Sequence, residues 1–482
     1  MLFNSIEFAI FLPIIFILYW FVANKNIKLQ NFLIVAASYL FYGWWDWRFL
    51  SLIFFSTVID FLIGKGLEKN EKPLTRKYLL WISILINIGF LGFFKYYNFF
   101  IDNFIYAFST LGIELSYQSL KIILPVGISF YTFQTLSYTI DVYKRKLKPT
   151  TEFITFAAFV SFFPQLVAGP IERATNLLPQ FKKNRKFDYN QATDGMRQIL
   201  WGFFKKIVIA DNCAVFADQI FNNYNDYSGS TLVLGAIFFA FQIYGDFSGY
   251  SDIAIGTARL FGFNLMQNFA FPYFSRDIAE FWRRWHISLS SWFRDYLYIP
   301  LGGSRGTNYF KIRNVFIIFL VSGFWHGSNW TFIIWGGLNA IYFLPVMLLN
   351  KNRINTNIVA QGKYLPSIKE VFSMVLTFSL TSLAWVFFRS EDIHHAISYL
   401  SNIIHPSTLT FPELITPKLE MIYTLLCIFI LLLIEWVNRD KIHGLDIASY
   451  KKNNRWILYF ILILMIITFG SFNQNSFIYF QF

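Results

Sequence analysis

Two histidines that stand among aromatic and glycine residues are the first candidates for chemistry. His326 lies in the segment Ser322-Gly323-Phe324-Trp325-His326-Gly327-Ser328-Asn329-Trp330, and His286 follows the run Phe281-Trp282-Arg283-Arg284-Trp285. Imidazole ordinarily titrates near neutral pH, so a histidine in apolar surroundings is a candidate for general acid–base catalysis. The alternative at each position is a structural histidine that only hydrogen-bonds to the backbone. Position in the sequence leaves both interpretations open.

Two carboxylates form a second group of candidates. Asp246 and Asp252 enclose a segment rich in serine and glycine within an apolar part of the chain. Carboxylates are costly in such surroundings and usually face a cavity or a cation. They are therefore candidate substrate-binding residues. The structural alternative is that they cap helices or pair with Arg259 or Arg276.

Residues 276–294 are predicted to form one amphipathic helix. At helical spacing one face is aromatic, with Phe281, Trp285, Trp292 and Tyr296. Arg283 falls on the opposite face, and Glu280 is spaced to pair with Arg276 or Arg284. Such a helix suits a membrane interface or the wall of a watery cavity. Trp285 and Arg283 are thus candidates for substrate contact, and the alternative for Arg283 is a side chain that only reaches the lipid head groups.

Several other kinds of site are excluded by the residue patterns. The remaining histidines fall in polar segments, where solvated side chains are expected: His394, His395, His405 and His443. Neither His286 nor His326 has further ligands at a metal-binding spacing. Asp246 or Asp252 could bind a metal, but nothing in the sequence supports this, so we expect no metal site. The chain has no Gly-x-Ser-x-Gly elbow and no Walker-A loop. Its two cysteines, Cys213 and Cys427, are predicted to be buried thiols.

Composition indicates that the elements positioning these residues are membrane helices. The 482 residues are 55% hydrophobic and only 14% charged, whereas soluble domains carry about 25% charged residues. The net charge of +13 accompanies no nucleic-acid-binding motif, so we expect it to reflect basic cytoplasmic loops. Apolar segments are predicted to span the membrane at residues 8–23, 31–46, 49–64, 78–95, 121–140, 231–248, 329–349, 368–388, 419–438 and 456–470.

The loops predict an orientation. The first segment lacks a basic flank and is expected to be a retained helix rather than a cleaved signal peptide, with the N-terminus outside. Residues 153–170 contain Pro164, Gly169 and Pro170, which would break a spanning helix, and are predicted to be re-entrant. That choice keeps the basic cluster at residues 182–186 in the cytoplasm, as the positive-inside rule requires. One membrane domain over residues 1–482 is the simplest organisation.

The run from Phe281 to Gly303 resembles the membrane-bound O-acyltransferase family, and in particular its bacterial branch that contains the alginate O-acetyltransferase membrane subunit. Further stretches similar to that branch are residues 42–46, 124–130, 163–170 and 246–252. The resemblance implies an all-helical protein of about ten to twelve transmembrane helices around a membrane-crossing funnel. It also implies transfer of an acyl group, usually acetyl, from a cytoplasmic thioester donor such as acetyl-CoA or an acyl carrier to a hydroxyl.

The resemblance also assigns roles. The family's near-invariant histidine corresponds to His326, and a second polar position of the family corresponds to His286. Attack of an alcohol on a thioester needs a base and a donor for the developing oxyanion. His326 is the expected base, and His286, Asn329 or a backbone N–H could polarise the carbonyl. No bound cofactor is expected.

Three alternatives remain at this stage. They are a D-alanyl transferase for teichoic acids, a lipid acyltransferase of the same family, and a transporter of polysaccharide or lipid precursors. The expected location is the cytoplasmic (inner) membrane, in contact with lipid. Expected partners are a cell-envelope or exported polysaccharide as acceptor and an extracytoplasmic, esterase-like acetyltransferase.

Overall fold

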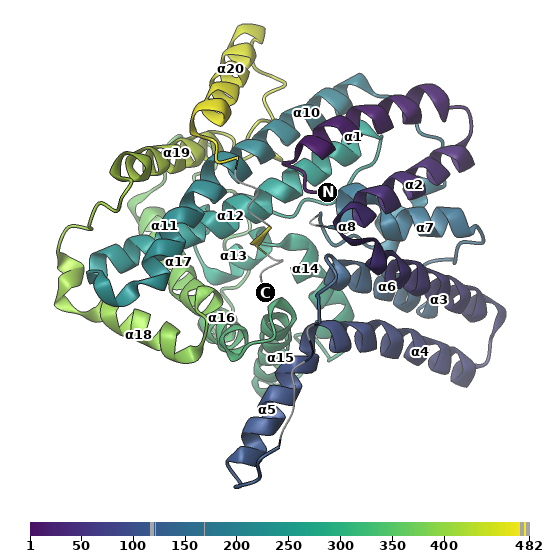
Figure 1. Cartoon of the computed structure of the whole chain (residues 1–482), viewed down its shortest axis with the longest axis horizontal. Coiled ribbons are helices and arrows are strands. Elements are labelled where there is room, and N and C mark those ends of the chain that lie inside the picture. Colours follow the sequence, from purple (N-terminus) through teal and green to yellow (C-terminus); the bar gives the residue numbers. More distant parts are fainter. Residues whose placement is uncertain (116–119, 121, 168, 473–476, 479–482) are drawn as a thin grey trace. The chain divides into compact units, whose positions relative to one another are not determined.

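Helices make up every regular element in the described part of the computed structural model (Figure 1). The structure describes residues 1–115, 120, 122–167, 169–472 and 477–478. Two compact units can be distinguished within the chain. The first comprises Met1–Ala192 with Thr257–Leu265, and the second comprises Thr193–Gly256 with Met266–Phe482. The single domain expected from the sequence stays a prediction.

The first unit is a layer of long helices around one buried helix. Its elements are α1 (Ile6–Ile17), η1 (Leu18–Val22), α2 (Ile27–Asp46), α3 (Leu50–Lys69), α4 (Pro73–Leu91), α5 (Tyr97–Ser109), α6 (Ile128–Tyr143), α7 (Phe153–Ser161), α8 (Phe163–Leu166) and α9 (Ala174–Phe181). Helix α6, which lies next to α3 and α4 in Figure 1, packs against α3, α4 and α9 and is buried along nearly its whole length. A buried carboxylate, Asp60, ties three helices together by accepting hydrogen bonds from Ser83, Asn87 and Thr139.

The segment predicted to be broken by proline and glycine is broken. Helix α7 ends before Phe162, where the backbone turns to φ −50° and ψ 104°, and the short α8 carries Pro164 in its first turn. Gly169 approaches the preceding turn so closely that a Cβ would lie 2.5 Å from Cα of Gln165. Ala168, between them, lies outside the described residues. The break is confirmed, and re-entrance into a membrane stays a prediction.

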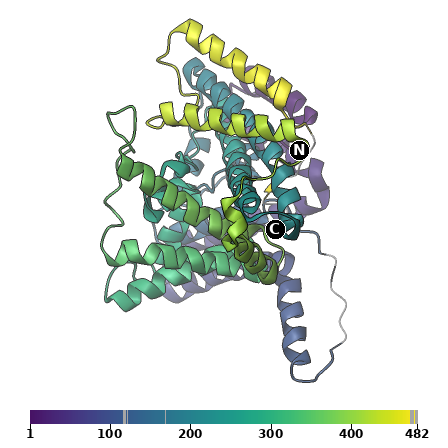
Figure 2. The same ribbon diagram turned by 90° about the vertical axis from the view of Figure 1, so that its left-hand side faces the viewer.

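The second unit carries the two candidate histidines. Its elements are η4 (Phe204–Ala210), α11 (Asp211–Asn222), η6 (Pro272–Phe274), α13 (Ile278–Arg284), α14 (Ile287–Phe293), η7 (Arg294–Tyr298), α15 (Asn308–His326), α16 (Trp330–Leu348), α17 (Ile368–Arg389), α18 (Ile393–Ile404), α19 (Lys418–Val437) and α20 (Lys452–Phe469). Helices α10 (Tyr189–Phe203) and α12 (Gly229–Leu260) each belong partly to both units. Tyr423 of α19 packs against Phe469 of α20 with ring centroids 5.0 Å apart, and Figure 2 shows these two helices near one another.

Close packing of α15 on α16 sets the position of His326. A Cβ on Gly323 would lie 2.2 Å from the carbonyl oxygen of Phe332, and a Cβ on Gly336 would lie 2.3 Å from that of Phe319. Only glycine allows two helix backbones to come this near. The helix pair therefore holds the C-terminal end of α15 against the start of α16.

The helices agree in part with the spans predicted from sequence. In the described residues, seven helical segments are long and apolar enough to cross a membrane, which fits a polytopic membrane protein. The span expected at residues 121–140 is instead the 16-residue helix α6, which begins at Ile128. Lys121, the first residue of the expected span, lies outside the described residues. The expected span at residues 231–248 is the middle of a continuous 32-residue helix, α12. Helix α15 was not among the predicted spans, and it is not among these seven segments either.

Candidate active site

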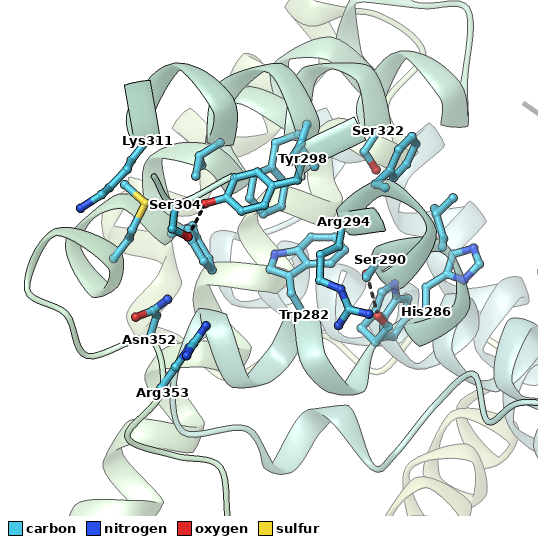
Figure 3. Close-up of a pocket in the computed structure, with 18 of the residues that line it drawn as sticks. Trp282, His286, Ser290, Arg294, Tyr298, Ser304, Lys311, Ser322, Asn352 and Arg353 are labelled. Carbon is cyan, nitrogen blue, oxygen red and sulfur yellow. Dashed lines mark hydrogen bonds between the residues drawn. The ribbon is translucent and has the colours of Figure 1, made fainter. Parts of the chain in front are cut away.

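A cavity of about 620 Å³ in the second unit brings the two candidate histidines together. Both His286 and His326 line it, with Trp282 and Trp285. Three cations, Arg294, Lys311 and Arg353, also line it, and no acidic side chain is among the described lining residues. In Figure 3, His286 lies at one end and Lys311, Asn352 and Arg353 at the other, with Trp282 and Arg294 between them. The cavity thus joins an imidazole end to a cationic end.

His326 is the last residue of α15 and only 4% exposed. Its ring meets Trp325, Trp335 and Phe388, with ring centroids 4.8, 5.1 and 5.4 Å away. Gly327 ends the helix in an extended conformation, and a Cβ there would lie 2.1 Å from the ring of Phe332. The flanking glycines therefore make room for protein neighbours. Aromatic walls hold the imidazole at the edge of the cavity.

His286 stands at a break in the chain, and the single helix predicted over residues 276–294 is wrong. Helix α13 ends at Arg284, Trp285 is extended, and His286 takes a left-handed conformation with φ 44° and ψ 54° before α14 begins. A non-glycine residue pays for this conformation, so surrounding contacts must hold it. The helix ends here because of contacts with residues distant in sequence, which the helical pattern cannot reveal.

Those contacts come from Asn268, a residue that sequence reasoning missed. Its side-chain oxygen lies 3.0 Å from Nδ1 of His286 and accepts hydrogen bonds from the hydroxyl (2.8 Å) and the backbone N–H (3.3 Å) of Ser288. Its backbone carbonyl accepts the N–H of Ile287 at 2.9 Å. Asn268 lies in an irregular segment 18 residues before His286, and no spacing in the sequence connects the two.

The two imidazoles lie near one another in apolar surroundings. Their ring centroids are 6.4 Å apart, and Phe247 of α12 stands edge-on to His286 at 4.5 Å. His286 is 1% exposed, and burial lowers its pKa to about 3. The ring is therefore neutral at physiological pH. Its Nε2 is buried and has no hydrogen-bond partner within the described part of the chain.

Trp285 lies in the wall of the cavity, and Arg283 does not. Trp285 stacks on Phe281 with ring centroids 5.5 Å apart and packs against Trp385 at 5.1 Å. Arg283 donates to the backbone carbonyls of Asn352 and Asn355, so its guanidinium holds the loop after α16. Support for binding an anionic substrate comes from Arg294, Lys311 and Arg353 instead.

The ion pairs predicted around Glu280 are confirmed. Its buried carboxylate pairs with Arg276 at 3.0 Å and with Arg284 at 2.9 Å. Both arginines also reach the backbone carbonyl of Asn357. This cluster fixes α13 to the loop that follows α16 and leaves neither arginine in the cavity lining.

Asp246 and Asp252 are engaged in buried ion pairs on α12. Asp246 lies 2.8 Å from Nζ of Lys206, and Asp252 lies 2.5 Å from Nζ of Lys205. Lys206 also bonds to Asp211 at 2.8 Å. The partners are thus two lysines of η4, not the arginines considered from sequence, and neither aspartate lines the cavity.

Asn329 also lies outside the cavity lining. Its side chain caps α16 by accepting the N–H of Thr331, and its amide nitrogen donates to the carbonyl of Glu391 at 2.8 Å. Both ends of the amide are committed, so its geometry favours a structural role.

The other histidines fit the prediction in part. His394 is exposed. His443 is not solvated as expected, because it is 2% exposed and its Nε2 lies 3.3 Å from Asp194. No group of three or more potential metal ligands occurs among the described residues.

These features define a class of protein, namely a polytopic all-helical membrane protein with a buried pair of histidines in a cavity that has a cationic end. Comparison with known sequences defines the family. The sequence model of the MBOAT, membrane-bound O-acyltransferase, family matches residues 144–388. The chain belongs to this family, in its AlgI-like branch, and is an acyltransferase.

Three relatives show the range of the family around this chain. It is 42% identical to the probable alginate O-acetylase AlgI of Pseudomonas syringae pv. tomato over 82% of this chain and 74% of that protein. It is 36% identical to the peptidoglycan O-acetyltransferase of Helicobacter pylori over 84% of this chain and 80% of that protein. It is 31% identical to the teichoic acid D-alanyltransferase of Streptococcus thermophilus over 55% of this chain and 68% of that protein.

Proposed function

We propose that this acyltransferase moves an acetyl group from a cytoplasmic thioester donor to hydroxyls of a cell-envelope or exported polysaccharide. The observation that carries the proposal is the pair of buried histidines at one end of a cavity whose other end is cationic. Relatives named as alginate and peptidoglycan O-acetyltransferases, which this chain covers over most of their length, support acetyl as the group and a glycan as the acceptor.

The cationic end supports a phosphorylated thioester as donor. Arg294, Lys311 and Arg353 line the cavity with positive charge, and no carboxylate is among its described lining residues; Asp295, which pairs with Arg294, lies outside the lining. Arginine and lysine are the usual partners of phosphate oxygens. A donor bound there by its phosphates would extend its thioester toward His286 and His326. Acetyl-CoA and an acyl carrier bearing a phosphorylated arm share this chemistry.

The histidine end supports general-base catalysis. His326 accepts the proton of the acceptor hydroxyl as its oxygen forms a bond to the thioester carbonyl carbon. The carbon–sulfur bond then breaks. His326 gives its proton to the leaving thiolate, which departs as a thiol. Neutral His286 lies beside this reaction with an available ring nitrogen. Trp282 lines the cavity, and its indole N–H is buried with no hydrogen-bond partner among the described residues, which favours it over Asn329 as the oxyanion donor.

The setting of the reaction follows from the same reasoning. A cytoplasmic donor and an extracytoplasmic glycan support a location in the inner membrane, in contact with lipid, and the positive-inside rule supports an N-terminus outside. Transfer proceeds directly, or through an extracytoplasmic esterase-like partner that completes it. D-Alanyl transfer to teichoic acid is a second candidate, favoured by the similarity to a teichoic acid D-alanyltransferase.

Mild base hydrolysis of purified envelope glycans tests the proposal. Released acetate and released D-alanine are measured in the native strain, in a deletion strain, and in deletions complemented with native protein or with His326→Ala. Loss of acetate on deletion, recovery with native protein and no recovery with His326→Ala would support it, and the glycan fraction would name the acceptor. Loss of D-alanine instead would establish the second candidate. Unchanged acetate throughout would refute acetylation of these glycans.

A further inference from the structure

Asn268 clamps the segment that carries His286 by both its backbone and its side chain. The backbone carbonyl receives the N–H of Ile287, and the side-chain oxygen receives two hydrogen bonds from Ser288. On the opposite side the amide nitrogen of Asn268 donates to the hydroxyl of Ser251 on α12 at 3.0 Å. Asn268, Ser251 and Ser288 are buried, so solvent does not compete for the bonds between their side chains.

These contacts fix which nitrogen of His286 carries the proton. A backbone N–H can only donate, so the atom of Asn268 that meets the N–H of Ser288 is the amide oxygen. An amide oxygen can only accept, so Nδ1 of His286, 3.0 Å away, must be the protonated nitrogen. In a neutral imidazole the other nitrogen then bears a lone pair. That nitrogen is Nε2, which is buried and has no hydrogen-bond partner among the described residues. The His286 ring itself lines the cavity.

We propose that Asn268 is a positioning residue that fixes His286 as the Nδ1–H tautomer, so that the Nε2 lone pair accepts a hydrogen bond from the acceptor hydroxyl beside His326. The inference rests on the proposed function and deepens it, because it gives the second histidine a defined role. His286 orients the hydroxyl whose proton His326 removes. It cannot donate to the thioester carbonyl while Nδ1–H is bonded to Asn268 and Nε2 is unprotonated.

The groups that face His286 do not stabilise its protonated form, so the neutral imidazole is favoured. Phe247 of α12, Phe269 and Trp325 of α15 are uncharged, and His326 is the titratable group that contacts it. Asp246 precedes Phe247 on α12, but its carboxylate pairs with Lys206. A carboxylate introduced at position 268 would be the first negative charge against Nδ1–H.

Asn268→Asp and Asn268→Leu test the proposal in opposite ways. A carboxylate in direct contact with Nδ1–H stabilises the imidazolium and should raise the pKa of His286 by about 2 to 3 units. Protonation removes the Nε2 lone pair, so Asn268→Asp should retain activity at pH 8 and lose it in acid. We compare the ratio of kcat/KM at pH 8 to kcat/KM at pH 5. For a rise of about 2 to 3 units, this ratio should be about two- to tenfold larger in Asn268→Asp than in the native enzyme. Asn268→Leu, which frees the tautomer, should lower kcat about tenfold or more at every pH, with the donor KM unchanged.

A buried asparagine away from the cavity provides the control. Asn438 is 3% exposed and bonds to the carbonyls of Ile434 and Gly444. Asn438→Asp introduces the same carboxylate into the same unit and should leave the pH profile of kcat/KM in place. A profile in Asn268→Asp that is lowered uniformly and keeps the native shape would indicate a merely structural residue and overturn the proposal.

Nitrogen-15 spectra of histidine-labelled protein provide a readout that needs no turnover. The His286 signals, assigned by their loss in His286→Ala, should show a protonated Nδ1 and a bare Nε2 in the native protein and a mixture in Asn268→Leu. A native Nε2–H tautomer would overturn the inference even if acetyl transfer is confirmed. The expected tautomer with no acetyl or D-alanyl transfer by purified native protein would instead refute the proposed function alone.

Discussion

At the scale of single residues, the two histidines differ in what holds them. His326 packs against aromatic rings of α15, α16 and α17, and Nδ1–H of His286 donates a hydrogen bond to the side-chain oxygen of Asn268. The hydrogen bond between Nδ1 of His286 and Asn268 restricts proton exchange on that ring to Nε2. The difference supports unequal roles in proton transfer.

Replacing His326 should abolish most of the activity without preventing insertion. General-base catalysis contributes about 10²- to 10⁴-fold, so His326→Ala should lower turnover at least about 100-fold. Acetyl transfer by purified protein measures the loss, and membrane-fraction yield measures insertion. His394→Ala removes an exposed histidine of the same unit and should keep native turnover. Native turnover in His326→Ala would contradict the assignment of the base.

Removing the cations of the cavity should weaken donor binding more than catalysis. A hydrogen bond to a charged group contributes about 1.5 to 3 kcal/mol. Lys311→Met and Arg353→Met should therefore each raise the donor KM on the order of tenfold or more and leave kcat within about twofold. Lys363→Met, an exposed lysine outside the cavity lining, should leave KM unchanged. A large fall in kcat with constant KM would place these cations in the chemical step.

At the scale of elements, helix breaks and close helix contacts position the site. The aromatic and basic run at residues 276–294 has a helical pattern, yet the chain divides it into α13 and α14 at Trp285 and His286. One continuous helix would not give His286 the left-handed backbone that Asn268 holds. Local propensity is worth a fraction of a kcal/mol per residue, so a set of buried hydrogen bonds overrides it.

The contact between α15 and α16 can be tested with a matched pair of glycines. A Cβ on Gly323 would lie 2.2 Å from a backbone oxygen of α16, whereas a Cβ on Gly337 would meet only a methyl group of Leu320, at 3.8 Å. Overpacking typically costs about 1 to 3 kcal/mol. Gly323→Ala should lower the thermal midpoint in detergent and reduce activity by displacing His326. Gly337→Ala should do neither.

The outcome is read by thermal unfolding and acetyl transfer on the same preparations. If Gly323→Ala kept both native stability and native turnover, the close approach of the two helices would not be what positions His326. Equal loss in both variants would indicate a general intolerance of alanine in this helix pair.

At the scale of the whole molecule, the distribution of charge predicts how the chain crosses the membrane. With the N-terminus outside, the turn between α2 and α3 faces outward and the basic loop after α3 faces the cytoplasm. Both native cysteines are buried, so an introduced cysteine would report its own location. Arg48 and Lys69 are exposed residues at these two turns.

Arg48→Cys should react with a membrane-impermeant maleimide in intact cells, and Lys69→Cys should react only after permeabilisation. The native protein, with its two buried thiols, serves as the unlabelled control. The reverse pattern would place the N-terminus in the cytoplasm and require a different count of crossings before residues 182–186.

The sequence alone determined the family, the all-helical membrane character, the break within residues 153–170, the ion pairs of Glu280, and the choice of His286 and His326 as candidates. These features depend on composition, on proline and glycine, and on spacings within one helix or motif, all of which are local. Tertiary structure alone decided which side chains reach the cavity. It paired Asp246 and Asp252 with lysines of η4, directed Arg283 and Asn329 to backbone carbonyls, buried His443, and brought Asn268 to His286. Partners distant in sequence leave no periodic signal, because the cost of burying each polar group is met by whichever neighbour the fold places beside it.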